Sequence, residues 1–171
     1  MPTLRIRPML LTLAALVLAV SLALPAQGAP ARDPKAAAGD CVACHKGEKV
    51  LPNKHRATKG QKLEACEKCH ERGTETALAG KVPGSHLHQL SGVGCAQCHG
   101  NVKKPTEVAQ EKCMSCHDTT KLAEKTASVK PANPHSSPHY GKDADCNLCH
   151  HQHAKSENYC AQCHKFEFKV P

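Results

Sequence analysis

Twelve cysteines and six of the histidines recur in one pattern, Cys-x-x-Cys-His, which is the part of the sequence best suited to chemistry. The six copies are Cys41–Cys44–His45, Cys66–Cys69–His70, Cys95–Cys98–His99, Cys113–Cys116–His117, Cys146–Cys149–His150 and Cys160–Cys163–His164. Two thiols at this spacing can add to the vinyl groups of one haem, and the adjacent imidazole can bind its iron. The pattern predicts six covalent haem c groups, with the motif histidines as proximal ligands.

Two other uses of paired cysteines compete with this interpretation. Disulfides are common in small exported proteins, but they need no histidine after the second cysteine. Zinc sites combine two Cys-x-x-Cys pairs, or one such pair with two spaced histidines. Both alternatives leave the six histidines unexplained, so haem attachment is the favoured interpretation.

The second face of each iron needs a ligand, for which methionine and histidine are the usual choices. Met1 and Met9 lie in the predicted leader, and Met114 lies inside a motif. Seven histidines lie outside the motifs, and six of them are candidate distal ligands: His55, His86, His88, His135, His139 and His153. The seventh, His151, directly follows a proximal histidine and is the predicted spare. Histidine on both faces implies low potentials and leaves no open iron for catalysis.

The composition predicts that haem replaces a side-chain core. Only 2% of the residues are aromatic and none is tryptophan, in a chain of net charge +8. Such a chain could not bury enough apolar surface to offset its ordering entropy. We therefore expect a mostly irregular fold with a few short α-helices, wrapped around a haem array and without a sheet core.

The first 28 residues resemble a secretory signal peptide. Arg5 and Arg7 precede an apolar stretch from residue 9 to residue 24, and small residues follow Pro25. The stretch is shorter than the roughly 20 residues that a membrane span needs. The sequence therefore predicts export to the periplasm, cleavage of the signal and no stable membrane span afterwards.

Turn-forming residues at 80–85 suggest a boundary between an N-terminal dihaem segment, 29–85, and a four-motif segment, 86–171. Helix formers predict short helices over 62–72, 106–118 and 156–164, and a further one over 121–128. The stretches 81–84 and 130–138 are predicted loops, and no strand pattern is evident.

The four-motif segment resembles the tetrahaem module of flavocytochrome c fumarate reductases and small tetrahaem cytochromes c, which are cytochrome c3-like. The likeness rests on PHSSPH at 134–139 and CNLCHHQHAKSENYCAQCHKFEF at 146–168. It implies that His135, His139, His153 and His88 are distal ligands, which leaves His55 and His86 for the first two motifs. The dihaem segment falls outside the resemblance. No dinucleotide fingerprint is present, so fumarate reduction by this chain alone is not supported.

These observations predict a low-potential hexahaem electron carrier of the periplasm, not an enzyme. The alternative is an electron-input cytochrome subunit for a separate flavoprotein reductase acting on a fumarate-like acid. A haem enzyme reducing a small nitrogen or sulfur oxyanion would need an open iron. Expected partners are redox proteins: a quinol-linked or other cytochrome donor, and a flavoprotein acceptor. Scattered lysines and export argue against nucleic acid, and haem propionates offset the positive charge.

Overall fold

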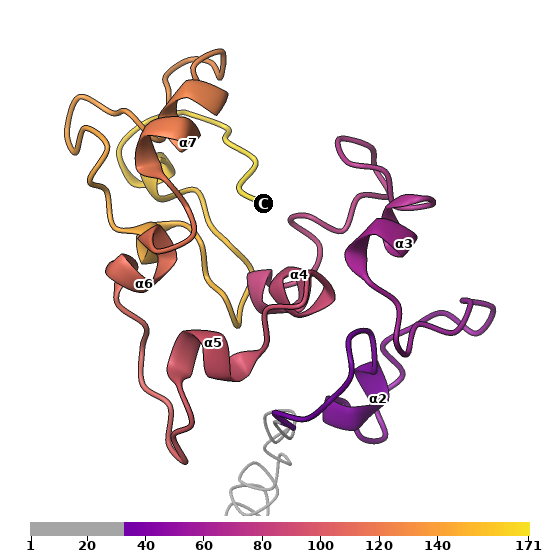
Figure 1. Cartoon of the computed structure of the whole chain (residues 1–171). Helices are drawn as coiled ribbons and strands as arrows, with labels where there is room; N and C mark the ends of the chain where they lie inside the picture. The colour runs from indigo at the N-terminus through magenta and orange to yellow at the C-terminus, as the bar shows by residue number, and fades with distance from the viewer. Residues whose placement is uncertain (1–32) are drawn as a thin grey trace, which may run out of the picture. The chain divides into compact units, whose positions relative to one another are not determined.

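The computed structural model describes residues 33–171, and the predicted signal peptide lies outside the described residues. Its helices are short and separated by loops (Figure 1). They are α2 (Cys41–Cys44), α3 (Leu63–Glu67), α4 (Gly84–Leu90), α5 (Cys95–His99), α6 (Gln110–Met114), α7 (Thr119–Lys125) and the 3-10 turns η1 (Cys146–Leu148) and η2 (Tyr159–Gln162). Within 33–171 there are only two isolated bridges, Ala79 with Val82 and Ser137 with Gly141. The expected fold, a few short helices without a sheet core, is confirmed.

Each Cys-x-x-Cys-His motif folds as a single helical turn. In five motifs the histidine N–H donates to the carbonyl of the first cysteine at 2.8–2.9 Å, and in the remaining one, the third motif, α5 contains the whole motif. Residues four apart in such a turn lie on the same face. The first thiol and the imidazole of each motif therefore share a face, and one flat group can meet both.

The predicted helices exist but are shorter than expected. The 62–72 and 106–118 predictions reduce to α3 and α6, and 156–164 reduces to the 3-10 turn η2. The 121–128 prediction corresponds to α7, which begins and ends earlier in the chain. Residue Ala109 before α6 is extended, and Asn147 Nδ2 donates to the Val108 carbonyl at 3.1 Å. This tertiary bond holds the preceding residues out of the helix. Asp118 caps α7 by accepting from the N–H groups of Thr120 and Lys121.

Helix α4 begins at Gly84, inside the stretch where a boundary and a loop were expected. Pro83 precedes it and Gly92, with φ of 85°, follows it. Proline at a helix start and glycine just past its end are a recognised pair of helix signals. The prediction of a loop over 81–84 is therefore wrong at its last residue, where α4 begins.

Side chains form almost no core. Among residues 33–171 only two apolar side chains are buried, Ala77 at 8% exposed and Ala123 at 6%. Val42 and Val102 are 69% and 55% exposed. A chain of this size normally buries large aliphatic and aromatic residues. The peptide by itself thus lacks the apolar interior that would stabilise it.

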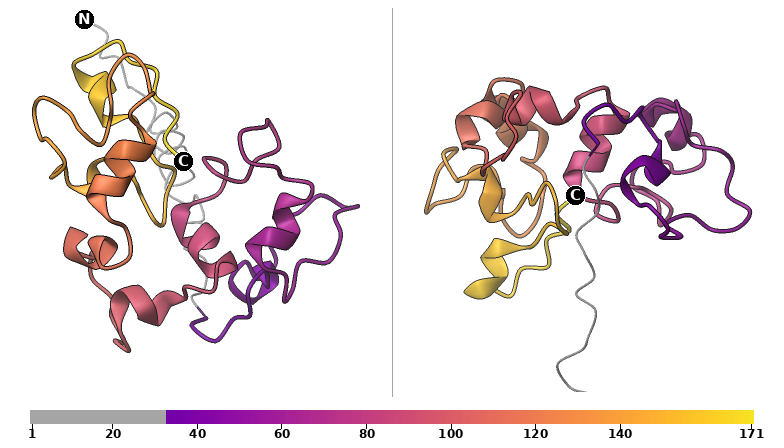
Figure 2. Two further views of the ribbon diagram at one scale, coloured as in Figure 1. Left: turned by 45° about the horizontal axis from the view of Figure 1, so that its top comes forward. Right: turned by 90° about the horizontal axis from the view of Figure 1, so that it is seen from below.

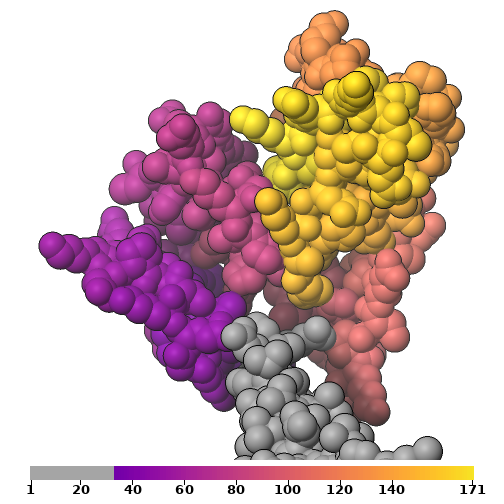
Figure 3. All heavy atoms as spheres, turned by 180° about the vertical axis from the view of Figure 1, so that it is seen from behind, coloured from indigo at the N-terminus to yellow at the C-terminus, as the bar shows by residue number. Residues whose placement is uncertain are grey.

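Local hydrogen bonds hold the loops of the C-terminal part in place. Asn133 Nδ2 donates to the Ala123 carbonyl at 2.8 Å, and the Thr126 hydroxyl donates to Asn133 Oδ1 at 2.7 Å. Ser156 Oγ donates to the carbonyl of Pro171 at 3.0 Å, which brings the chain end back beside the last two motifs. Figures 2 and 3 show this last stretch, in yellow, against the orange segment.

Gly39 is required where the chain enters the first motif. Its φ is 68°, and an added Cβ would lie 2.1 Å from the Thr58 carbonyl oxygen. The Thr58 hydroxyl donates to the Gly39 carbonyl at 2.7 Å, so the two segments cannot simply separate. We expect Gly39→Ala to lower stability by more than the roughly 1–2 kcal/mol of a left-handed alanine.

Gly47→Ala is the matched control, because φ is 82° there and an added Cβ meets nothing within 4 Å. Thermal melting followed by haem absorbance would compare the two variants. Equal losses of stability would mean that the contact with Thr58 has no energetic role.

Candidate haem sites

The structure pairs every motif histidine with one histidine from outside the motifs. The ring centres lie 5.9–6.1 Å apart in all six pairs. The pairs are His45 with His86, His70 with His55, His99 with His153, His117 with His88, His150 with His135, and His164 with His139. No histidine belongs to two pairs. The structure thus brings together all six predicted proximal histidines and all six distal candidates.

The spacing fits one metal ion between two imidazoles. A metal–imidazole bond is about 2.0 Å and the nitrogen lies about 1.1 Å from the ring centre, which gives centres about 6.2 Å apart. Incidental ring contacts would not select one motif histidine and one other histidine each time. The donor set therefore fits a haem iron with histidine on both faces.

Hydrogen bonds to Nδ1 orient several of these rings. His88 Nδ1 lies 2.9 Å from the Gly84 carbonyl, His70 Nδ1 2.6 Å from that of Thr76, and His55 Nδ1 2.8 Å from that of Arg56. A carbonyl only accepts, so Nδ1 is the donor in each bond, and Nε2 is the ring nitrogen left to bind a metal.

Two further rings are held by other partners. His135 Nδ1 lies 3.2 Å from the Thr126 hydroxyl, and His150 makes a hydrogen bond with the backbone of Pro171. Burial lowers the pKa of His135 and of His150, which favours the neutral, metal-binding form. These supporting residues are not predictable from the sequence, because only the folded loops bring them to the rings.

His151 lies apart from the paired rings. Its Nε2 is 3.5 Å from a carboxylate oxygen of Glu157, at the surface. The side chain next to it in sequence, His150, instead faces His135, with the two ring planes inclined by only 7°. This is the arrangement expected if His151 is the spare.

Neighbouring motifs lie close enough for their thiols to interact. Burial raises the pKa of Cys66, and Cys41 raises it further. Burial and then Cys113 raise the pKa of Cys146. The first motif therefore lies near the second, and the fourth near the fifth.

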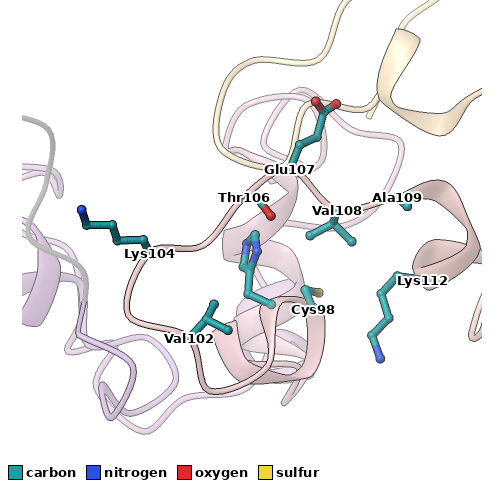
Figure 4. Close-up of a pocket in the computed structure, with 9 residues that line it drawn as sticks. Cys98, Val102, Lys104, Thr106, Glu107, Val108, Ala109 and Lys112 are labelled. Carbon is teal, nitrogen blue, oxygen red and sulfur yellow. The ribbon is translucent and has the colours of Figure 1, made fainter.

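A cavity of about 480 Å³ opens beside the third motif. Its volume is within the range of about 300–1,000 Å³ found for cofactor sites. Figure 4 shows Cys98 and the apolar side chains of Val102 and Val108 around it, with the amino groups of Lys104 and Lys112 extending to different sides. Thr106 and Glu107 also line the cavity, so its walls are part apolar and part polar. The apolar side chains suit a flat apolar ring, and the two lysines suit the carboxylates that it carries.

Three further observations concern the cysteines, possible metal clusters and membrane spans of the described residues. All twelve thiols are free in the structure. Residues 33–171 contain no cluster of three or more histidine, cysteine or carboxylate groups able to hold a metal ion, and no helix in this range is long and apolar enough to cross a membrane.

Sequence comparisons relate the chain to known proteins. The profile of the cytochrome c3 family matches residues 87–165. The chain is 36% identical over 83 residues to the acrylate reductase cytochrome subunit of Shewanella woodyi, in a match covering 47% of this chain and 70% of that protein. The chain belongs to the cytochrome c3 family. It is therefore a multihaem c-type cytochrome of an electron-carrying type, and the predicted resemblance is confirmed.

Two larger relatives match over shorter shares of their length. A probable fumarate reductase of Shewanella frigidimarina is 33% identical over 97 residues, which is 55% of this cytochrome and 16% of that protein. A C-type polyheme cytochrome of Geobacter sulfurreducens is 32% identical over 99 residues, 50% of this cytochrome and 13% of that protein. No solved structure matches significantly.

Proposed function

We propose that this cytochrome carries six covalent haem c groups, each with a motif histidine on one face and a distal histidine on the other, and transfers electrons at low potential. When bound, haem c supplies reversible one-electron exchange at its iron. The one-to-one pairing of six motif histidines with six others is the observation that supports this function.

The protein's own residues perform three tasks in this proposal. The twelve thiols anchor the groups, the paired rings occupy both axial positions, and the Nδ1 hydrogen bonds fix the orientation of several rings. With both axial positions taken, the irons cannot bind a substrate. The proposed function is therefore electron carriage, as predicted from the sequence.

We place the protein in the periplasm, with redox proteins as partners. The leader at 1–28 supports export, and haem attached through thioethers tolerates an exported, loosely folded peptide. The sequence charge of +8 falls to +6 once the leader with Arg5 and Arg7 is removed, and the propionates of six haems roughly offset it, which leaves separate lysine and carboxylate patches. Such patches suit weak, transient docking to a donor and an acceptor.

Haem content and spin state test this function directly. Mass spectrometry of the mature protein should show six covalent haems, and electron paramagnetic resonance of the oxidised protein should show only low-spin iron. The absorption band of methionine-bound ferric haem should be absent, since Met114 lies inside a motif. Four haems, or a high-spin signal in the native protein, would refute the proposal.

A second candidate function is electron input to a separate flavoprotein reductase. The similarity to a cytochrome subunit named for acrylate reductase favours this role. A tagged copy of the chain should then recover a flavoprotein from the periplasm and reduce its flavin. A general shuttle would reduce several acceptors without forming such a complex.

A further inference from the structure

Helix α4 carries two paired histidines on opposite faces. His86 and His88 are two residues apart, and a helix turns about 100° per residue, so their side chains point in nearly opposite directions. Their partners come from different parts of the chain. His86 faces His45 of the first motif, and His88 faces His117 of the fourth.

The face of α4 that bears His86 closes the site of the first motif. One cavity is lined by Cys41, Cys44 and His45 together with His86, Gln89 and Leu90. The three α4 residues are spaced i, i+3 and i+4 and so form one helix face. The N-terminal segment therefore supplies only part of this site, and α4 supplies the other wall.

The start of α4 is fixed to the loop that carries His153. The Ser85 N–H donates to the Gln152 carbonyl at 2.8 Å, and a Cβ on Gly84 would lie 2.6 Å from Gln152 Oε1. The sites of the first, third and fourth motifs thus converge on one short helix, which lies between α3 and α6 in Figures 1 and 2.

The match to the cytochrome c3 family begins inside this helix. The family profile begins at residue 87, directly after His86 and before His88. His88 therefore belongs to the matched module, whereas His86 adds a ligand for a motif outside it. The position of the match boundary inside α4 indicates where the N-terminal segment is joined to the module.

We propose that α4 is the junction between the N-terminal dihaem segment and the tetrahaem module. It holds the segment on the module, and the two parts exchange electrons across it. His86 ties the first motif to the module by an axial bond, and His88 on the opposite face places the fourth-motif site beside it. One electron passes from the reduced site to the oxidised one, and no bond forms or breaks. This inference rests on the proposed bis-histidine ligation.

Cleaving the backbone next to α4 tests the junction in the full holoprotein. A specific protease site inserted between Lys81 and Val82, where Lys81 is exposed, would separate motifs 1 and 2 from motifs 3 to 6. If His86 binds the iron of the first motif, the two cut pieces stay together as one species on native chromatography. In His86→Ala the same cut should release them as two species.

His55→Ala is the matched control. It also opens one distal position in the N-terminal piece, but His55 and its partner His70 lie on the same side of the cut. After the cut, the two pieces of the His55→Ala protein should stay together as one species on native chromatography. Both variants should keep six haems and gain one high-spin signal, which shows that any difference comes from the bond across the cut.

The ring planes give a second readout. The planes of His88 and His117 are inclined by 90°, whereas those of His45 and His86 are inclined by 31°. Perpendicular and near-parallel imidazoles give different low-spin resonance signals. His86→Ala should remove a near-parallel signal and keep the perpendicular one.

Different results would overturn the junction and the proposed function. Pieces that separate in the unsubstituted protein, or remain together in His86→Ala, would overturn the junction. A high-spin signal in the uncut, unsubstituted protein would instead overturn bis-histidine ligation, and it would be seen before any cleavage.

Discussion

Without covalent haem, the chain is expected to be unfolded. Replacing all twelve cysteines with serine should abolish the cooperative thermal transition and leave a circular dichroism spectrum of an irregular chain. The reason is the missing core: among residues 33–171 only Ala77 and Ala123 are buried apolar side chains. Two alanines cannot offset an ordering cost of about 1–2 kcal/mol per residue.

The helices give no independent support. The described α-helices have four to seven residues, and isolated helices shorter than about 12 residues are marginal in water. The haem-loaded protein is the control and should melt in a cooperative transition. A cooperative transition in the haem-free variant, or its resistance to proteases, would show that the peptide has a core of its own.

Removing one distal histidine is expected to open one identified iron. His153→Ala should leave the third-motif haem with only His99, and His139→Ala should leave the sixth-motif haem with only His164. Each variant should show one new high-spin signal by electron paramagnetic resonance. Each should also melt earlier, because an axial bond contributes to folding as well as to the cofactor site.

His151→Ala is the control within the same loop. It removes a surface contact between His151 Nε2 and a carboxylate oxygen of Glu157, and exposed polar pairs of this kind contribute only about 0–1 kcal/mol. All six haems should stay low-spin and the melting temperature should change little. A high-spin haem in His151→Ala, or full low-spin character in His153→Ala, would mean that His151 is an iron ligand.

The fold class could be predicted from the sequence because the short spacing within each motif determines its local structure. Four residues from the first cysteine to the histidine make one helical turn, whatever surrounds the motif. The sparse apolar side chains and the Gly- and Pro-rich stretches predicted the absence of a sheet core. Helix ends were less predictable, since contacts such as that of Asn147 with the Val108 carbonyl decide where α6 begins.

The sequence alone determined the composition of the candidate sites. Six motifs fixed the thiols and the proximal histidines, and the lack of a free methionine left six histidines and one spare for the opposite faces. These inferences need only residue types, counts and short spacings, because each motif acts within a single turn of chain.

Only the tertiary structure decided which histidine meets which motif. The partners His99 and His153 are 54 positions apart in the sequence, and His45 and His86 are 41 apart. The order of loops along the chain does not predict which residues at such separations meet in space. The resemblance left His55 and His86 together for the first two motifs, and only the structure pairs His86 with the first motif and His55 with the second. The physical reason is that the fold of the whole chain positions each distal histidine, and the short spacings within the motifs do not determine that fold.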